Sequence, residues 1–218
     1  LFHLAEDVVG GTVQDAVDHL RQVGREIKDK GLPAELAPFN IFLLGYGHVA
    51  TGCREILDAL PNEEISPDDL FSHSKNFRND RLYLVVFQEK HLVERKDGGA
   101  FELQDYYQNG NDYKSRLGKY LHLCSIYVNA IYWAPGYPVF LPRSELKLLQ
   151  TDPQKLVIIG DITCDINGSV AATLKASNPD EPVYIYDAMS GTVQNGFMGK
   201  GIANCAVDNF PCEFSREA

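Results

Sequence analysis

A glycine-rich turn is the part of the sequence whose residue types and spacing best suit binding chemistry. The apolar run 39–44 leads directly into Gly45-Tyr-Gly-His-Val-Ala50, which has the Gly-x-Gly-x-x-Ala spacing of a dinucleotide-binding turn. In such a turn Gly45 permits the sharp reversal, Gly47 lets the backbone approach a pyrophosphate, and Ala50 lets the next helix pack closely. The pyrophosphate would lie at the helix N-terminus, where free amides and the helix dipole favour an anion. An ordinary glycine turn without a ligand is the alternative, because the spacing alone is a weak signal.

Two carboxylates form a second candidate site. Asp161 and Asp165 follow the apolar run 156–159, so we expect them at the carboxyl end of a strand, where open α/β sheets bind ligands. There Asp165 would orient a substrate ammonium group or the nicotinamide ribose. A purely structural loop stays open as the alternative, since Asp and Asn are ordinary turn formers. The side chain of His48, inside the glycine turn, is expected to face solvent or the edge of a cofactor, and no metal site is predicted.

The elements that must position these residues alternate between helices and strands. Thr12 and Asp15 form a capping-box-like start to a helix that ends at Gly31. Apolar runs predict strands at 39–44, 82–87 and 156–159, with a further strand at 125–128 and a short extended piece near 64–66. Pro142 opens a later helix, and within the polar residues 97–120 Gly98-Gly99 and Asn109-Gly110-Asn111 mark loops. This order predicts an α/β fold, a Rossmann-like, doubly wound, mostly parallel sheet preceded by a connector helix.

Composition limits the class of protein. The 218 residues, 44% of them hydrophobic, are enough for a substantial core. The net charge of −10 argues against nucleic acid as a partner, and no apolar run approaches the roughly 18 residues of a membrane span. Five cysteines without a Cys-x-x-Cys pair are typical of an intracellular chain with free thiols and no zinc site. The expected location is the cytoplasm in a bacterium and the mitochondrion in a eukaryote.

Four motifs, taken in order, carry a resemblance to a known family. They are Gly45-Tyr-Gly-His-Val-Ala-Thr-Gly52, Asn129-Ala-Ile-Tyr-Trp133, Asp161-Ile-Thr-Cys-Asp-Ile-Asn-Gly-Ser169, and Ala206-Val-Asp-Asn-Phe-Pro211 with Ser215-Arg-Glu-Ala218. The sequence resembles the lysine–2-oxoglutarate reductase (saccharopine dehydrogenase) family, and most of all the reductase half of the bifunctional aminoadipic semialdehyde synthases. More distantly, it is similar to alanine dehydrogenase and to the NAD-binding part of transhydrogenase. The resemblance covers nearly the whole chain.

The resemblance implies roles for residues at several strand ends. Asp165 is the implied catalytic residue, placed beside the nicotinamide where it would contact substrate and ribose. The implied cofactor-binding residues are Gly45, Gly47, His48 and Val49 at the pyrophosphate, Asn129 and Ala130 beside the adenosine half, Asp161 and Thr163 beside the nicotinamide, and Val207, Asp208 and Asn209 at the carboxamide. Asp161 is also expected to hold its loop, so that its loss lowers stability more than it changes chemistry.

The choice between NAD and NADP is poorly marked in the sequence. NAD enzymes usually carry an acid about 20 residues past the glycines, and that position falls near Ser66 here, which we therefore count among the cofactor-binding residues. Acidic residues flank Ser66 and suit NAD, whereas Lys75 and Arg78 lie slightly downstream and would suit a 2′-phosphate. The resemblance implies NADP, so the expected cofactor is NADP or NAD, with NADP favoured.

The chain is expected to be part of a two-domain enzyme. Residues 1–33 are interpreted as a connector segment and helix from a missing N-terminal catalytic domain, 34–205 as the dinucleotide-binding domain, and 206–218 as a return segment toward the missing domain. The resemblance implies that the missing domain supplies a Lys and a His that bind the keto acid and move protons. The expected partners are an amino acid or keto acid substrate and that domain, with a homo-oligomer as a further option and neither nucleic acid nor a membrane.

Three functions stay open at this point. The first is the cofactor domain of a reductase that joins lysine to 2-oxoglutarate and reduces the imine to saccharopine, inactive as an isolated fragment. The second is an alanine-dehydrogenase-like amino acid oxidoreductase. The third is a non-catalytic module that binds NAD(P) without turnover.

Overall fold

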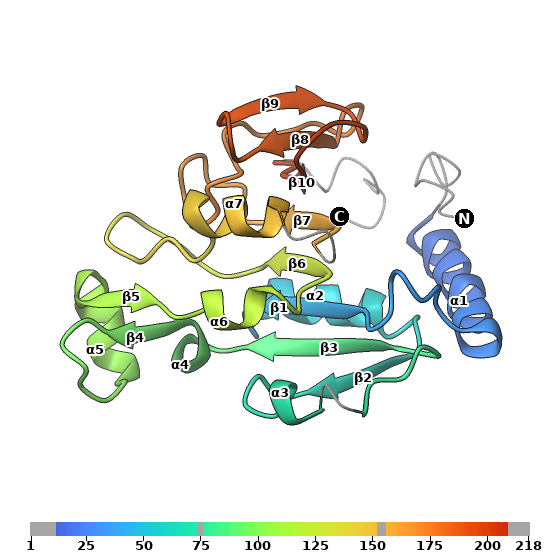
Figure 1. Ribbon diagram of the computed structural model, residues 1–218, viewed down its shortest axis with the longest axis horizontal. Coiled ribbons are helices and arrows are strands. Elements are labelled where there is room, and N and C mark those ends of the chain that lie inside the picture. The colour runs from blue at the N-terminus through green and yellow to red at the C-terminus, as the bar shows by residue number, and fades with distance from the viewer. Residues whose placement is uncertain (1–11, 74–75, 152–155, 209–218) are drawn as a thin grey trace.

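The central element of the structure is an eight-stranded sheet (Figure 1). The computed structural model describes residues 12–73, 76–151 and 156–208. Across the sheet the strands follow the order β2 (Asn62–Ile65), β3 (Leu82–Phe87), β1 (Asn40–Leu44), β6 (Ile126–Asn129), β7 (Ile158–Asp161), β10 (Ile202–Cys205), β8 (Val183–Asp187) and β9 (Thr192–Asn195). Neighbouring strands from β2 to β10 pair in parallel, and β8 pairs antiparallel with both β10 and β9. The predicted Rossmann-like, mostly parallel α/β class is confirmed.

The strand that carries the glycine turn, β1, is buried on both faces. All five of its residues are buried. Because side chains alternate along a strand, Phe42 and Leu44 pack into the larger core, and Ile41 and Leu43 pack into the smaller one. This double burial explains why the strand reads as a continuous apolar run rather than as an alternating pattern. Because β1 is held in the core up to Leu44, the glycine turn begins at Gly45.

Helices and a small hairpin cover the sheet. The helices are α1 (Val13–Lys30), α2 (His48–Leu57), α3 (Leu70–His73), α4 (Glu89–Leu92), α5 (Leu103–Gln108), α6 (Gly118–Leu121) and α7 (Arg143–Thr151), with the 3₁₀ helix η3 (Gly110–Asp112) after α5. The hairpin pairs β4 (Val93–Arg95) with β5 (Tyr113–Ser115). The polar segment 97–120, in which the sequence marks loops at 98–99 and 109–111, also contains α5, η3 and β5, because buried aromatic residues such as Tyr106 and Tyr113 draw it onto the larger core.

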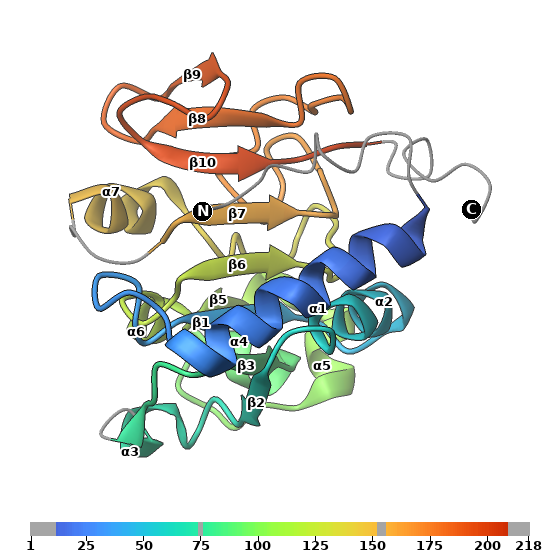
Figure 2. The same cartoon turned by 90° about the vertical axis from the view of Figure 1, so that its right-hand side faces the viewer.

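The N-terminal helix α1 begins and ends as the sequence predicts. The Thr12 hydroxyl accepts a hydrogen bond from the Asp15 amide at 3.2 Å, and the Asp15 carboxylate accepts one from the Thr12 amide at 2.7 Å. The helix stops before Gly31, which has a φ of 77°. In Figure 2 α1 crosses in front of the sheet, and Ile27 is half-buried against the smaller core. The assignment of 1–33, 34–205 and 206–218 to separate units stays a prediction, and 1–11 and 209–218 lie outside the described residues.

The strand order departs from the usual Rossmann order at one place. In that order the second strand lies beside the first, whereas here β3 lies beside β1 and β2 forms the edge of the sheet. Strands β1 and β3 pair in register from Asn40 opposite Tyr83 to Leu44 opposite Phe87. The pairing continues into the turn, because the Gly45 amide donates to the Phe87 carbonyl oxygen at 3.0 Å. The end of β3, and not the end of β2, is therefore next to the glycine turn.

Candidate functional site

The glycine turn connects β1 to α2 at the carboxyl edge of the sheet. Gly45 has a φ of 107°, and a Cβ at this residue would lie 2.6 Å from the Ala130 carbonyl oxygen. Gly47 differs, because its φ is −79° and a Cβ there would meet nothing within 4 Å. Packing within the protein therefore requires glycine at the first position but not at the second. The open space over Gly47 is what a ligand needs to approach the backbone closely.

Helix α2 begins directly at this turn. Gly47 is its N-cap, so the amides of His48 and Val49 belong to the first turn, where helix amides have no acceptor within the helix. Both side chains are exposed. Ala50 is fully buried against the core that contains Ile41, which is the close packing that the motif predicts. The turn thus presents backbone donors and the positive end of the helix dipole at the sheet edge.

An open cavity of about 310 Å³ lies beside the turn. Gly45, Tyr46 and Gly47 line it from the turn itself, while Glu89 lines it from the end of β3 and Ala130 from the end of β6. The cavity therefore spans the carboxyl ends of the adjacent strands β3, β1 and β6. This is the place where open parallel sheets bind their ligands.

Glu89 is the one charged side chain among the described residues that line this cavity. Its carboxylate accepts hydrogen bonds from the hydroxyl of Tyr46 at 3.0 Å and from that of Tyr107 at 2.9 Å. Burial, and then the hydrogen bond to Glu89, raises the pKa of both tyrosines, so both hydroxyls stay protonated and donate to the carboxylate. Sequence reasoning missed this cluster, although Glu89 follows the predicted strand 82–87 by only two residues and could have been found as a charge at a strand end.

A buried polar network lies at the ends of β6 and β7. The Asn129 amide nitrogen Nδ2 lies 2.7 Å from Asp161 Oδ1, 2.9 Å from Thr163 Oγ1 and 2.9 Å from Ser169 Oγ. The Thr173 hydroxyl donates to Asp161 Oδ2 at 2.5 Å. Asn129 and Asp161 are 0% and 1% exposed, and burial raises the pKa of Asp161 against the opposing effect of these hydrogen bonds. These polar groups bond to one another rather than lining the cavity.

The network extends across the sheet to β8 and β10. Asn204 Nδ2 donates to the Tyr184 hydroxyl at 2.7 Å and lies 3.3 Å from Thr173 Oγ1. The Tyr184 hydroxyl in turn donates to the Ala172 carbonyl at 3.1 Å. Strands that are distant in the sequence are thus tied together by buried polar side chains. Such a network is costly to break, because each group left without a partner loses both water and its bond.

The loop after β7 holds Asp165 near the segment that follows β10. Two of its residues, Cys164 and Asn167, have positive φ values of 45° and 58°, which is uncommon for residues other than glycine and marks a tightly determined loop. Burial, followed by the charges of Asp161, Asp208 and Asp165, raises the pKa of the Cys164 thiol. Asp208, which follows β10, is thus close enough to act on the thiol beside Asp165.

The predicted site residues lie in one row along the carboxyl edge of the sheet. The row contains Gly45, Gly47, His48 and Val49 after β1, Asn129 and Ala130 at the end of β6, Asp161, Thr163 and Asp165 after β7, and Val207 and Asp208 after β10. From β1 to β10 the row crosses four adjacent strands, a span of about 14 Å at about 4.8 Å per strand spacing. Asn209 lies outside the described residues. Their roles in binding or catalysis stay predictions.

Ser66 is not beside the glycine turn. It follows β2, so β3 lies between it and β1. Its hydroxyl donates to Asp69 Oδ2 at 2.7 Å and accepts from the Asp69 amide at 3.1 Å, which closes a turn before α3. Arg78 precedes β3 and so lies toward the opposite, amino edge of the sheet, while Lys75 is outside the described residues. Ser66 is predicted from its spacing past the glycines, and the strand order separates it from the turn by one strand; its role in cofactor binding stays a prediction.

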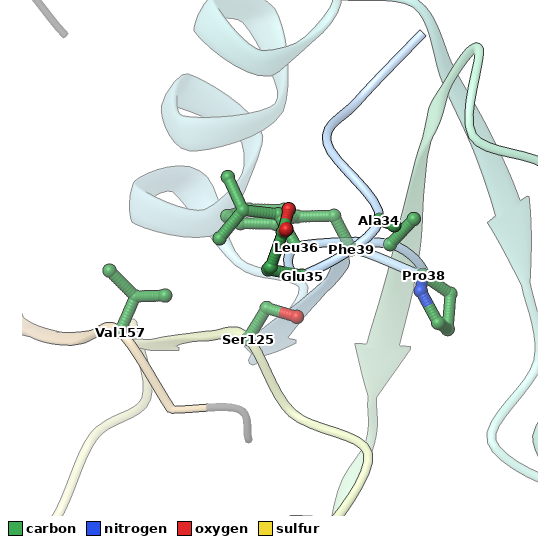
Figure 3. Close-up of a pocket in the computed structure, with 8 residues that line it drawn as sticks. Ala34, Glu35, Leu36, Pro38, Phe39, Ser125 and Val157 are labelled. Carbon is green, nitrogen blue, oxygen red and sulfur yellow. The ribbon is translucent and has the colours of Figure 1, made fainter. Parts of the chain in front are cut away.

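A second, smaller cavity of about 80 Å³ lies at the amino edge of the sheet (Figure 3). Leu36 and Phe39 line it from the segment before β1, Ser125 from the residue before β6, and Val157 from the residue before β7. The Ser125 hydroxyl accepts a hydrogen bond from the Asn40 amide at 3.1 Å. None of the described residues around this cavity belongs to the predicted site, so the cavity is on the wrong edge for a ligand held by the glycine turn.

The described ranges contain neither a membrane span nor a metal cluster. No helix there is long and apolar enough to cross a membrane. No group of His, Cys, Asp and Glu in the same ranges could hold a metal ion. The cysteines that the structure describes, Cys53, Cys124, Cys164 and Cys205, are free thiols.

The fold and the turn define a Rossmann-like α/β protein with a Gly-x-Gly-x-x-Ala turn at its ligand edge. No family model matches the chain. It is 31% identical to alpha-aminoadipic semialdehyde synthase of Arabidopsis thaliana over 90% of this chain and 20% of that protein. It is 28% identical to the mitochondrial alpha-aminoadipic semialdehyde synthases of Mus musculus and Bos taurus over 93% of this chain and 24% of each of those proteins.

These relatives confirm the resemblance of the sequence to the aminoadipic semialdehyde synthases. The chain is homologous to a segment of the alpha-aminoadipic semialdehyde synthases, which are enzymes by name. It spans between 20% and 24% of the length of these relatives.

Proposed function

We propose that this chain is the NAD(P)-binding domain of an oxidoreductase that resembles lysine–2-oxoglutarate reductase. In the proposed reaction lysine and 2-oxoglutarate form an imine, a hydride from NAD(P)H goes to the imine carbon, a proton goes to the nitrogen, and saccharopine results. The observation that carries the proposal is the open space over Gly47 at the start of α2. Homology to the alpha-aminoadipic semialdehyde synthases supports the same class of chemistry.

The residues at the turn fit a dinucleotide for reasons of geometry. Gly45 has to be glycine for the turn to form, whereas Gly47 has no such internal requirement. Packing within the protein therefore does not explain why residue 47 is glycine. Gly47 lies at the N-cap of α2 and on the wall of the cavity, where a ligand that comes close to the backbone would require a glycine. In the proposal the amides of His48 and Val49 bind the pyrophosphate oxygens.

Residues farther along the edge take the other end of the ligand. In the proposal Ala130 lies beside the dinucleotide, and the segment at Val207 and Asp208 reaches the nicotinamide carboxamide. Asp165 orients the substrate and the nicotinamide ribose. Its place in the loop after β7, near Asp208 and Cys164, supports this role, because loops at this edge reach over bound ligands.

Substrate binding and proton transfer belong, in this proposal, to a second domain of the same natural protein. The chain spans 20% to 24% of its relatives, which leaves room for such a domain. With a eukaryotic source the proposed location is the mitochondrion, in line with the names of the mammalian relatives. The isolated chain is therefore expected to bind the cofactor without reducing the imine.

Calorimetric titration of the isolated chain with NADH and NADPH tests the proposal. We expect saturable binding of at least one of them and no oxidation of it when lysine and 2-oxoglutarate are added. Absence of binding to either dinucleotide would overturn the proposed function. Turnover by the isolated chain would keep the cofactor site but overturn the assignment of proton transfer to another domain.

The variant Gly47→Asp sharpens this test. A carboxylate at the point of closest approach occludes and repels the pyrophosphate, so we expect affinity to fall at least about 100-fold. The fold should be retained, because Asp is a favourable N-cap residue and a Cβ meets nothing there. Gly52→Asp is the matched control, since Gly52 also lies on α2 with open space around it. Unchanged affinity in a folded Gly47→Asp variant would show that the turn is structural only.

A catalytic role for Asp165 is tested in the full-length enzyme. We expect Asp165→Asn to lower turnover by on the order of 10²-fold, as for loss of a positioned charge at the reacting centre. Cofactor affinity should change far less, because the pyrophosphate is held at the other end of the row. Normal turnover in the folded variant would remove Asp165 from the mechanism.

A further inference from the structure

The strand order puts an acidic residue where the adenosine ribose of a bound dinucleotide would lie. In Rossmann-type sheets the acid that binds the ribose hydroxyls follows the strand next to the glycine-turn strand. Here that neighbour is β3, whose last residue Phe87 is hydrogen-bonded to Gly45 at 3.0 Å. Glu89 follows two residues later and lines the same cavity as Gly45 and Gly47. Because β3 and not β2 lies beside β1, the acid that binds the ribose is expected after β3, at Glu89, and not near Ser66 after β2.

The carboxylate of Glu89 is held in place and has acceptor capacity to spare. The hydroxyl of Tyr107 donates to Oε1 at 2.9 Å, and the hydroxyl of Tyr46 donates to Oε2 at 3.0 Å. A carboxylate offers about four lone-pair sites, so two tyrosine donors leave room for the two hydroxyls of a ribose. Because Tyr46 belongs to the glycine turn and Tyr107 to α5, the carboxylate is fixed relative to the turn from two sides.

The same cavity lacks what a 2′-phosphate requires. Among its described lining residues there is no Lys or Arg. Arg78, which the sequence offered as a partner for a phosphate, lies toward the amino edge of the sheet and pairs with Asp80 at 2.5 Å. A 2′-phosphate placed near Glu89 would face a like charge without a compensating cation, whereas a 2′-hydroxyl would donate a hydrogen bond to it.

We propose that Glu89 binds the 2′- and 3′-hydroxyls of the adenosine ribose and makes this domain select NAD(H) over NADP(H), with Tyr46 and Tyr107 as positioning residues. This inference rests on the proposed cofactor function and goes against the preference for NADP that the family resemblance implies.

The test compares the dissociation constants of NADH and NADPH for the isolated chain, measured by calorimetry. The wild-type chain should bind NADH more tightly by about tenfold or more, since a half-buried carboxylate that accepts from a hydroxyl repels a phosphate at the same place. Glu89→Gln keeps the shape of the side chain but removes its charge, so the ratio of the two constants should move toward one. Tyr107→Phe should move the ratio in the same direction by a smaller factor.

Glu94→Gln is the matched control, because Glu94 lies on β4, pairs with Lys114 at 3.2 Å and does not line the cavity. It should leave the ratio unchanged. If both dinucleotides bind the wild-type chain equally, or if NADPH binds more tightly, the selection by Glu89 is wrong while the proposed cofactor function stands. If Glu89→Gln folds and its ratio of the two dissociation constants equals that of the wild-type chain, the selection by Glu89 is likewise wrong. If neither dinucleotide binds, both proposals fail together.

Discussion

At the carboxyl ends of β1 and β3 the polar groups lie on the wall of an open cavity, whereas at the ends of β6 and β7 they bond to one another in the interior. Glu89 accepts hydrogen bonds from two tyrosines and still lines open space. Asp161, by contrast, is 1% exposed and has both carboxylate oxygens bonded to Thr173 and Asn129. Two carboxylates at the same edge of one sheet therefore have different surroundings.

The difference shows that a position at a strand end does not by itself make a ligand-binding residue. A buried carboxylate whose partners are all within the protein contributes to holding strand ends together, and it is not free to bind a ligand without breaking those bonds. A carboxylate with unused acceptor sites on a cavity wall can accept from a ligand without such a loss. We therefore expect substitution of Asp161, in the closed region at the ends of β6 and β7, to change stability, and substitution of Glu89, in the open region at the ends of β1 and β3, to change binding.

The largest effect is expected from a substitution inside the turn itself. Gly45→Ala should destabilise the chain by about 3 kcal/mol, since it adds strain from a positive φ to a backbone clash. The clash arises because only 2.6 Å would separate the new Cβ from the Ala130 carbonyl oxygen. Gly47→Ala is the matched control and should leave the free energy of unfolding nearly unchanged, because nothing lies within 4 Å. Denaturant unfolding of both variants measures the contrast, and equal losses would contradict the two roles given to these glycines.

The next effect tests the closed region. Asp161→Asn places an amide where Asn129 and Thr173 now find acceptors, so at least one buried donor loses its partner. We expect a loss of about 2 kcal/mol in the free energy of unfolding, with the cofactor affinity of the folded fraction retained. Glu89→Gln should show the reverse, with lowered NADH affinity and stability kept within about 0.5 kcal/mol. Loss of NADH affinity in folded Asp161→Asn, at normal stability, would instead place Asp161 at the ligand.

Much of the sheet could be predicted because its strands are continuous apolar runs. The predicted strand 82–87 coincides with β3, and the strand predicted at 125–128 is β6 shifted by one residue. The strand order could not be predicted, because the spacing of runs along the chain does not say which strands pair. The antiparallel end of the sheet was missed, although Val183-Tyr-Ile-Tyr186 followed by Gly191 is a strand and turn signal.

The role of a site residue could be predicted where it depends on backbone geometry, and could not be predicted where it depends on side-chain contacts. The glycine turn is readable from Gly45 and Gly47 because the roles of these residues depend on the missing Cβ. The roles of Asn129 and Asp161 depend on partners such as Ser169 and Thr173, and the sequence does not show whether such polar groups face the interior or a ligand. Glu89 was missed because its importance depends on which strand lies beside β1.

The smallest effect is a difference in how stability depends on pH. Burial raises the pKa of Asp161 above its ordinary value of 3.8, so the folded chain holds this proton more tightly than the unfolded chain. The resulting contribution to stability is fully present below pH 3.8 and is lost as the pH rises through the raised pKa. Asp161→Asn cannot titrate, so the stability of the wild-type chain relative to this variant should fall as the pH rises from about 4 to about 7.

Asp187 supplies the opposite case as a control. Hydrogen bonds from Gln150, Ser190 and the Met189 amide lower its pKa to about 2, so its contribution is present above pH 3.8 and is lost only as the pH falls through about 2. The stability of the wild-type chain relative to Asp187→Asn should therefore stay constant over the window in which the Asp161→Asn comparison changes. Urea unfolding of the three chains at several pH values measures both differences. If the stability of the wild-type chain relative to Asp161→Asn rises with pH, hydrogen bonding and not burial determines the pKa of Asp161. The contrast between the buried carboxylate of Asp161 and the cavity carboxylate of Glu89 would then not rest on burial.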